Sequence, residues 1–76
     1  MRDRNKRLKK RVEASRSELK LLQVKSPRFH FANKYPKYSG KENEDRLNNL
    51  WYGRAFDEDF TTELEAFVEF KKVQKT

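Results

Sequence analysis

Seven cations crowd the first eleven positions of the chain, MRDRNKRLKKR, together with a single acid, Asp3. They are Arg2, Arg4, Lys6, Arg7, Lys9, Lys10 and Arg11. On a helix these side chains point to nearly every side, so Asp3 and the nearby Glu13 cannot neutralise them. An anion relieves their repulsion, and the phosphates of a nucleic-acid backbone do so with a strong salt dependence. The stretch predicts a phosphate-binding arm; the alternatives are a basic surface for an acidic protein and a solvated helix end.

A second group of cations alternates with aromatic residues in PRFHFANKYPKYSGK, residues 27–41. Its candidate nucleic-acid contacts are Arg28, Lys34, Tyr35, Lys37 and Tyr38. Single strands are bound in this way, because bases stack on aromatic rings while cations hold the phosphates. We expect Phe29 and Phe31 to be buried under the helices and the tyrosines to be exposed. No sequence-reading motif is present, so weak sequence selectivity is expected.

A third group has the composition of a protein-binding surface. The stretch LNNLWYGRAFDEDF contains Trp51, Tyr52, Arg54 and Phe56, and Trp, Tyr and Arg are the residue types that anchor protein interfaces. Trp51 is also a natural core residue in so small a chain. Tyr52 and Arg54 are therefore the expected exposed pair. This group favours an alternative function, a modulator or inhibitor that docks on a larger protein machine through its basic helix and this aromatic patch.

Catalytic and metal-binding chemistry have little support. There is no cysteine, so disulfides and thiolate sites are excluded, and His30 is the sole histidine. General acid–base work by His30 on RNA is a further alternative. Clustered acids at residues 42–45 and 57–59 stand where helices are expected to begin, so capping and the helix dipole explain them. We expect a non-enzymatic protein with no cofactor and no metal.

Charge is divided unevenly along the chain. Residues 1–41 hold fourteen Lys and Arg against three acids, and residues 42–76 hold five against nine, which together give the net charge of +7. Such an asymmetry is typical of a protein with one polyanion-binding face. The acidic half is expected to fold against the basic arm or to pair with it in a second copy, so a homodimer is an alternative.

Length and composition bound the class of protein. With 76 residues, 34% of them hydrophobic, 41% charged and 13% aromatic, the chain has room for one small domain over residues 1–76 with an aromatic core. Residues 1–14 are the arm or helix extension, and residues 15–76 are the packed part. No apolar run of signal-peptide or membrane-spanning length is present. An intracellular location, in the cytoplasm or in the nucleoid or nucleus, is expected, with no membrane partner.

The basic arm is expected to begin a long helix. Apolar residues recur at helical spacing, and a proline follows, which predicts a helix over residues 3–25. The seam consists of Leu8, Val12, Leu19 and Leu22, with Ser15 in the missing position. Ser15 and Glu18 also have capping-box spacing, so an alternative is a helix that starts at Ser15 and leaves the arm disordered.

An extended segment and a short helix are expected next. Two prolines and alternating aromatic residues favour extended chain over residues 27–38. Ser39 and Glu42 then have capping-box spacing for a helix over residues 41–52, which Gly53 ends.

A last helix is expected over residues 58–73, capped by Asp57. The rival is a strand, which gives an α+β fold with a short hairpin between residues 28–35 and 63–72. Length and the order of the charges favour the helix. The expected fold is therefore mostly α, a small three-helix domain with a long basic N-terminal helix and an extended aromatic-basic segment. Its expected core is Leu19, Leu22, Leu47, Leu50, Trp51, Phe60, Leu64 and Phe67.

Overall fold

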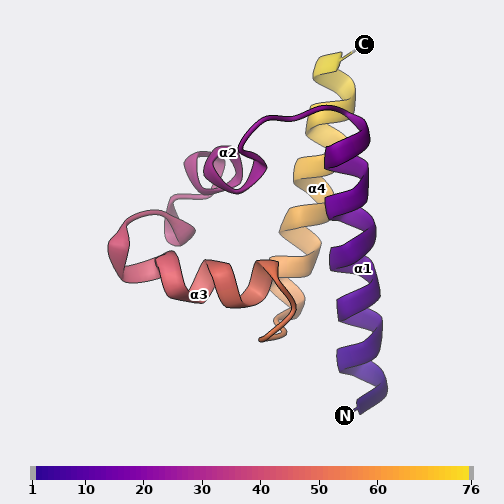
Figure 1. Cartoon of the computed structure of the whole chain (residues 1–76), viewed down its shortest axis with the longest axis vertical. Helices are drawn as coiled ribbons and strands as arrows, with labels where there is room; N and C mark the ends of the chain where they lie inside the picture. Colours follow the sequence, from indigo (N-terminus) through magenta and orange to yellow (C-terminus); the bar gives the residue numbers. More distant parts are fainter. Residues whose placement is uncertain (1, 76) are drawn as a thin grey trace.

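Figure 1 shows the computed structural model of the chain, which describes the backbone of residues 2–75 and the side chains of residues 3–74. Along the chain these residues form α1 (Arg2–Leu21), α2 (Pro27–Lys34), the 3₁₀ turn η1 (Pro36–Tyr38), α3 (Lys41–Trp51) and α4 (Glu58–Lys75). No strand occurs among the described residues, so the hairpin alternative is wrong. The mostly α prediction is confirmed, with four helices in place of three.

α1 and α4 lie side by side and run in the same direction, while α2 and α3 lie together on one side of that pair (Figure 1). The predicted seam of α1 is confirmed, since Leu8, Val12, Ser15 and Leu19 are each 5% exposed or less. Leu22 is only half-buried. The helix is continuous from its first described residue, so the alternative start at Ser15 is wrong.

α1 ends at Leu21, earlier than predicted. Gln23 has a left-handed backbone (φ 57°), and its N–H donates to the carbonyl of Lys20 at 3.0 Å. The N–H of Val24 donates to the carbonyl of Leu19 at 3.2 Å. These are the two hydrogen bonds of a Schellman ending. These backbone hydrogen bonds therefore end the helix several residues before Pro27 would prevent its continuation.

The segment predicted to be extended is helical. α2 begins at Pro27, and proline suits the first helical position because its missing N–H would have no partner there. It ends at Lys34, since Tyr35 precedes Pro36 and a pre-proline residue avoids the helical region. Helical spacing brings Phe31 and Tyr35 to one side, with ring centroids 4.9 Å apart. The two prolines thus begin helical turns instead of preventing them.

Phe31 is the centre of the core. Its side chain is fully buried, and its ring centroid lies 4.9 to 6.1 Å from those of five aromatic residues. These are Tyr35, Tyr38, Trp51, Phe60 and Phe67. Aromatic pairs in tilted or edge-to-face arrangements contribute about 0.5–1.5 kcal/mol beyond burial. One side chain of α2 therefore fastens that helix to η1, α3 and α4.

Most of the predicted core is buried, but two aromatic residues differ from expectation. Leu19, Leu47, Leu50, Trp51, Phe60, Leu64 and Phe67 are all buried. Phe29 is 64% exposed, because the helix turns it away from the side that carries Phe31. Tyr38 is 2% exposed, because η1 holds it against Phe31 and Phe60. Tyr35 is half-buried.

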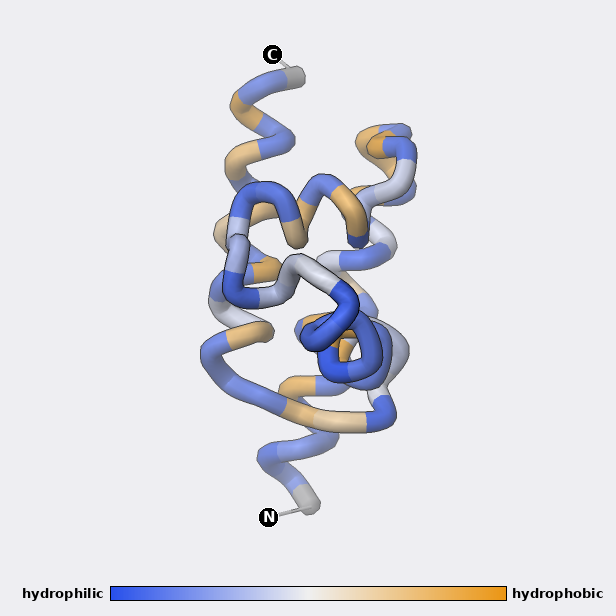
Figure 2. Tube along the Cα trace, turned by 90° about the vertical axis from the view of Figure 1, so that its left-hand side faces the viewer, coloured by the Kyte–Doolittle hydropathy of each residue, from blue (hydrophilic) through white to orange (hydrophobic). Residues whose placement is uncertain are grey.

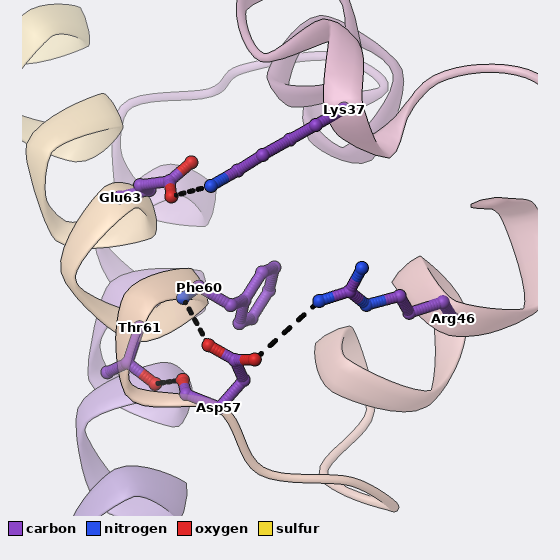
Figure 3. A network of polar contacts seen from close by, with 6 residues as sticks. All are labelled: Lys37, Arg46, Asp57, Phe60, Thr61 and Glu63. Carbon is purple, nitrogen blue, oxygen red and sulfur yellow. Dashed lines mark hydrogen bonds and ion pairs between the residues drawn. The ribbon is translucent and has the colours of Figure 1, made fainter.

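The start of α4 is capped by Asp57, as predicted. Its Oδ1 accepts a hydrogen bond from the N–H of Phe60 at 3.0 Å, and its carbonyl accepts one from the Thr61 hydroxyl at 2.8 Å (Figure 3). Arg46 of α3 lies 3.7 Å from the other carboxylate oxygen. Such a cap contributes about 1 kcal/mol and here also joins two helices.

The start of α3 differs from the prediction. Gly40 occupies its N-cap with φ 85°, and no side chain caps the helix. Ser39 instead donates its hydroxyl hydrogen to the carbonyl of Pro36 at 2.8 Å and closes η1, so the capping box with Glu42 does not form. Gly53 follows the helix with φ 77°, which confirms its predicted role at the end of α3.

Hydrophobic residues stand in short stretches between hydrophilic ones along the helices (Figure 2). The helices therefore bury one side and present charged side chains on the other. Over the described part of the chain, no helix has both the length and the apolar character that crossing a membrane requires.

Candidate nucleic-acid interface

Arg11 forms the best-defined ion pair of the predicted arm. Its Nε and Nη2 donate to the two carboxylate oxygens of Glu65 in α4, at 3.0 and 2.6 Å. This hydrogen bonding raises the pKa of Arg11 and lowers that of Glu65 from their ordinary values. The side chains are 38% and 42% exposed, so solvent screens the pair. Glu65 occupies two of the five N–H donors of Arg11, and its negative charge weakens the attraction of this arginine for a phosphate.

The same arrangement repeats along the two helices at seven-residue steps. One step earlier, Arg4 lies 3.2 Å from Glu58, and one step later Glu18 lies 3.6 Å from Lys72. A constant offset between partners is the pattern that two parallel helices in register produce. The expectation that the acidic half folds against the basic arm is confirmed at Arg4 and Arg11, while pairing with a second copy stays a prediction.

Four other cations of the arm, Lys6, Arg7, Lys9 and Lys10, are exposed. Among residues 3–74, no carboxylate forms an ion pair with Lys6, Arg7, Lys9 or Lys10. The side chain of Arg2 lies outside the described residues. Lys9 points to the α3 side of the molecule, since a Cβ placed on Gly53 would lie 4.0 Å from its Cγ.

Three arginines from three elements surround Tyr52. Their Cζ atoms lie 5.2 Å (Arg16 of α1), 5.7 Å (Arg28 of α2) and 5.8 Å (Arg54, after α3) from the centroid of its ring. Arg28 also donates to the Tyr52 hydroxyl at 2.9 Å, and Arg54 donates to the side-chain oxygen of Asn49 at 3.1 Å. We name Arg16, Arg28 and Arg54 the arginine cluster. Within the described side chains, none of the three has a carboxylate partner.

The arginine cluster concentrates positive charge. Because all three share one ring, no two Cζ atoms are more than about 12 Å apart, close to the Debye length of about 10 Å at 0.1 M salt. Attraction to the half-exposed ring of Tyr52 contributes only about 0.5–1 kcal/mol for each cation. Glu13 lines a neighbouring hollow together with Arg16 and Lys20, which still leaves an excess of cations there. An anion bound between the arginines would lower the repulsion.

A groove opens beside the arginine cluster, between α2 and α3. Its volume is about 570 Å³, and Arg28 and Tyr52 belong to its lining together with the exposed Phe29. Asn48 also lines it, and its buried Oδ1 accepts no hydrogen bond from the described residues. The groove thus places an exposed aromatic ring next to the cations.

The predicted nucleic-acid contacts Lys34, Lys37 and Tyr38 interact with other residues of the fold. Lys37 forms an ion pair with Glu63 of α4 (Figure 3). The Nζ of Lys34 lies 3.9 Å above the ring centroid of Phe70. Burial, with a smaller contribution from Glu63, raises the pKa of Tyr38 above its ordinary value.

The predicted protein-interface group is divided between core and surface. Trp51 is 5% exposed and belongs to the core, so it is not a surface anchor. Tyr52 is 50% exposed, Phe56 is 37% exposed, and Arg54 joins the arginine cluster. Residues predicted for two separate sites, Arg28 in one and Tyr52 with Arg54 in the other, therefore meet at one surface.

Sequence reasoning missed Arg16. Lys9, Arg16 and Lys20 each follow a buried seam residue directly, and their spacing of seven and four places them on one side of α1. That spacing was visible in the sequence. Which neighbours this side faces depends on the position of α2 and α3.

The acidic groups begin helices, as predicted. Glu42 and Glu44 lie in the first turn of α3, and Glu58 and Asp59 lie in the first turn of α4, where the helix dipole favours negative charge. No three metal-ligating side chains come together in the part of the chain that the structure describes.

No protein-family model, no curated protein and no solved structure matches this chain.

Proposed function

We propose that this chain is a small, non-enzymatic nucleic-acid-binding protein that holds the phosphate backbone with weak sequence selectivity. The observation that supports it is the arginine cluster: three guanidinium groups from three elements gather around Tyr52, and no carboxylate of the described residues pairs with them. Guanidinium is the side-chain group that binds phosphate oxygens through two parallel hydrogen bonds.

The supporting cations come from the same side of α1. Lys9 lies beside the turn that carries Arg54, and Lys20 lines the hollow next to Arg16. These residues extend the positive surface along the helix, as a backbone of regularly spaced phosphates requires. Arg4 and Arg11 contribute less in this proposal, because each is paired with a glutamate of α4. No element of the fold is assigned to read base edges, and this accounts for the weak selectivity.

The test is a fluorescence-anisotropy titration with random-sequence duplex DNA, single-stranded DNA and RNA at about 50 and 200 mM salt. A variant with Arg16→Gln, Arg28→Gln and Arg54→Gln should lower affinity at least about tenfold at the lower salt and reduce the salt slope by about 2 to 3. These arginines have exposed or half-exposed side chains, so circular dichroism should show a folded variant.

The matched control removes the same charge from the outer side of α1. It carries Lys6→Gln, Arg7→Gln and Lys10→Gln, three exposed residues with no described ion-pair partner. A clearly smaller loss of affinity is expected in this control. Equal losses in the two variants would show that net charge alone acts, and the absence of salt-dependent binding in the unaltered protein would refute the proposal.

A second candidate function is docking on an acidic protein surface. Exposed apolar side chains favour a protein partner over nucleic acid, since protein surfaces can cover them: Leu21 and Val73, at the C-terminal ends of the parallel helices α1 and α4, are 77% and 73% exposed. The anisotropy titration distinguishes the two functions when polyglutamate is added as a competitor. If the partner is an acidic protein, polyglutamate should displace the labelled nucleic acid as well as unlabelled nucleic acid does. If polyglutamate binds as tightly as single-stranded DNA at both salt concentrations, the acidic-protein function is preferred.

A further inference from the structure

The groove between α2 and α3 has the size of a ligand site. At about 570 Å³ it lies within the range of about 300–1,000 Å³ that is usual for ligand pockets. Its walls come from α2 (Pro27, Arg28) and from the end of α3 (Trp51, Tyr52), so both helices position it. A ligand in this groove would touch Arg28 and Tyr52 and would therefore lie next to the arginine cluster.

Phe29 gives the groove an aromatic face. It is 64% exposed although Phe31, two residues later in the same helix, is fully buried. Its described ring contact is an edge-to-face arrangement with His30, with centroids 6.0 Å apart. A large exposed aromatic side chain at the rim of a groove offers a surface on which a planar apolar group stacks.

The phosphate site and the aromatic face are adjacent in sequence and in space. Arg28 precedes Phe29, and its guanidinium is held by the hydrogen bond to the Tyr52 hydroxyl (2.9 Å). In one nucleotide a single sugar joins the phosphate to the base. When the phosphate of a nucleotide binds to the arginine cluster, the base of that nucleotide lies near Phe29, provided that the base is not stacked within a duplex.

We propose that this groove takes an unpaired nucleobase stacked on Phe29, and that the protein therefore prefers single-stranded to double-stranded nucleic acid. This inference rests on the proposed function. In a duplex the bases are paired and stacked inside, so only the phosphates reach the arginine cluster. In a single strand, stacking on an aromatic side chain adds to the phosphate contacts and tolerates any base.

The test compares a single strand of about 12 nucleotides with the duplex that it forms with its complement, using oligodeoxythymidine and, in a second arm, oligouridine. Single strands should bind at least about tenfold more tightly than the duplex at the same salt concentration. Phe29→Ala should lower single-strand affinity about tenfold and leave duplex affinity unchanged, since stacking on one aromatic side chain has about this magnitude. Comparison of the affinities for oligodeoxythymidine and oligouridine shows whether DNA or RNA is preferred.

Phe56→Ala is the matched control, because Phe56 is 37% exposed and does not line the groove. It should leave both affinities unchanged. Trp51, the sole tryptophan, lines the groove, so its fluorescence should change on addition of the single strand and not of the duplex.

The outcomes separate this inference from the proposed function. Salt-dependent binding with equal affinity for both forms, or with no effect of Phe29→Ala on the single strand, overturns the groove inference and leaves the phosphate-binding function standing. Loss of both affinities in Phe29→Ala also overturns it. If neither the single strand nor the duplex binds, the phosphate-binding function is refuted, and the groove inference with it.

Discussion

Arg11 and Arg16 belong to the same helix, yet their charges have opposite roles. Arg11 faces α4, where Glu65 binds it through two hydrogen bonds. Arg16 faces α2 and the end of α3, where it meets two further arginines around Tyr52. The position of a cation around a helix, and not its position along the chain, therefore decides whether its charge is paired with a carboxylate of the fold.

The two sides of α1 also differ in how they are held together. Between α1 and α4, ion pairs at seven-residue steps flank an apolar seam. The α2 side is held instead by aromatic packing centred on Phe31, whose ring lies close to rings from η1, α3 and α4. A substitution at Phe31 should therefore weaken the packing of α2 against α3 and α4. A substitution at Glu65 should weaken the packing of α1 against α4.

The largest effect is expected from Phe31→Ala. Truncation of a fully buried phenylalanine costs about 3–5 kcal/mol, a large part of the stability of a small domain. The variant should lose most of its cooperative thermal unfolding transition, followed by circular dichroism. Phe29→Ala in the same helix is the control and should leave the Tm unchanged, because Phe29 is mostly exposed. Similar shifts in both variants would contradict the central position of Phe31.

A smaller effect is expected from Glu65→Gln. Both partners of the pair with Arg11 are more than a third exposed, so its removal should cost about 0.2–1 kcal/mol, or a Tm decrease of a few degrees. Because Arg11 lowers the folded-state pKa of Glu65, the contribution is complete above the ordinary value of 4.5 and is lost as pH falls through the lowered pKa.

The measurement is the Tm as a function of pH. The unaltered protein should lose stability below about pH 4.5 more steeply than Glu65→Gln does. Glu58→Gln serves as control, since the pair of Glu58 with Arg4 is more exposed and should matter less. Parallel pH profiles for the unaltered protein and Glu65→Gln would show that the pair contributes nothing to folding.

The smallest effect is expected from Arg54→Gln. Removal of this cation relieves repulsion within the arginine cluster, but it also removes the attraction to the Tyr52 ring and the hydrogen bond to Asn49. These contributions oppose each other, so the free energy of unfolding should change by less than about 0.5 kcal/mol, whereas Arg11→Gln lowers it. Phosphate should also raise the Tm of the unaltered protein more than chloride does at equal ionic strength, and this difference should shrink in Arg54→Gln. If Arg54→Gln lowers the Tm as much as Arg11→Gln does, the arginine cluster is part of the structural framework.

Much of the local structure was predictable. The burial of Leu8, Val12 and Leu19 follows from their spacing, and the cap at Asp57 follows from its position before an acidic first turn. The prediction of extended chain over residues 27–38 is wrong, because its two prolines begin helical turns. A proline is equally compatible with the first position of a helix, and the burial of Phe31 favours the helix there.

The basic and acidic halves follow from the sequence alone, as do the seam of α1 and the residue types of the candidate interface. Which cations are neutralised depends on the tertiary structure, because the partners of Arg4 and Arg11 lie 54 residues away along the chain. Likewise, Arg16, Arg28 and Arg54 are separated in sequence and meet only where three elements converge on Tyr52. Electrostatic interaction depends on distance in space, and a sequence specifies that distance only within a single helix.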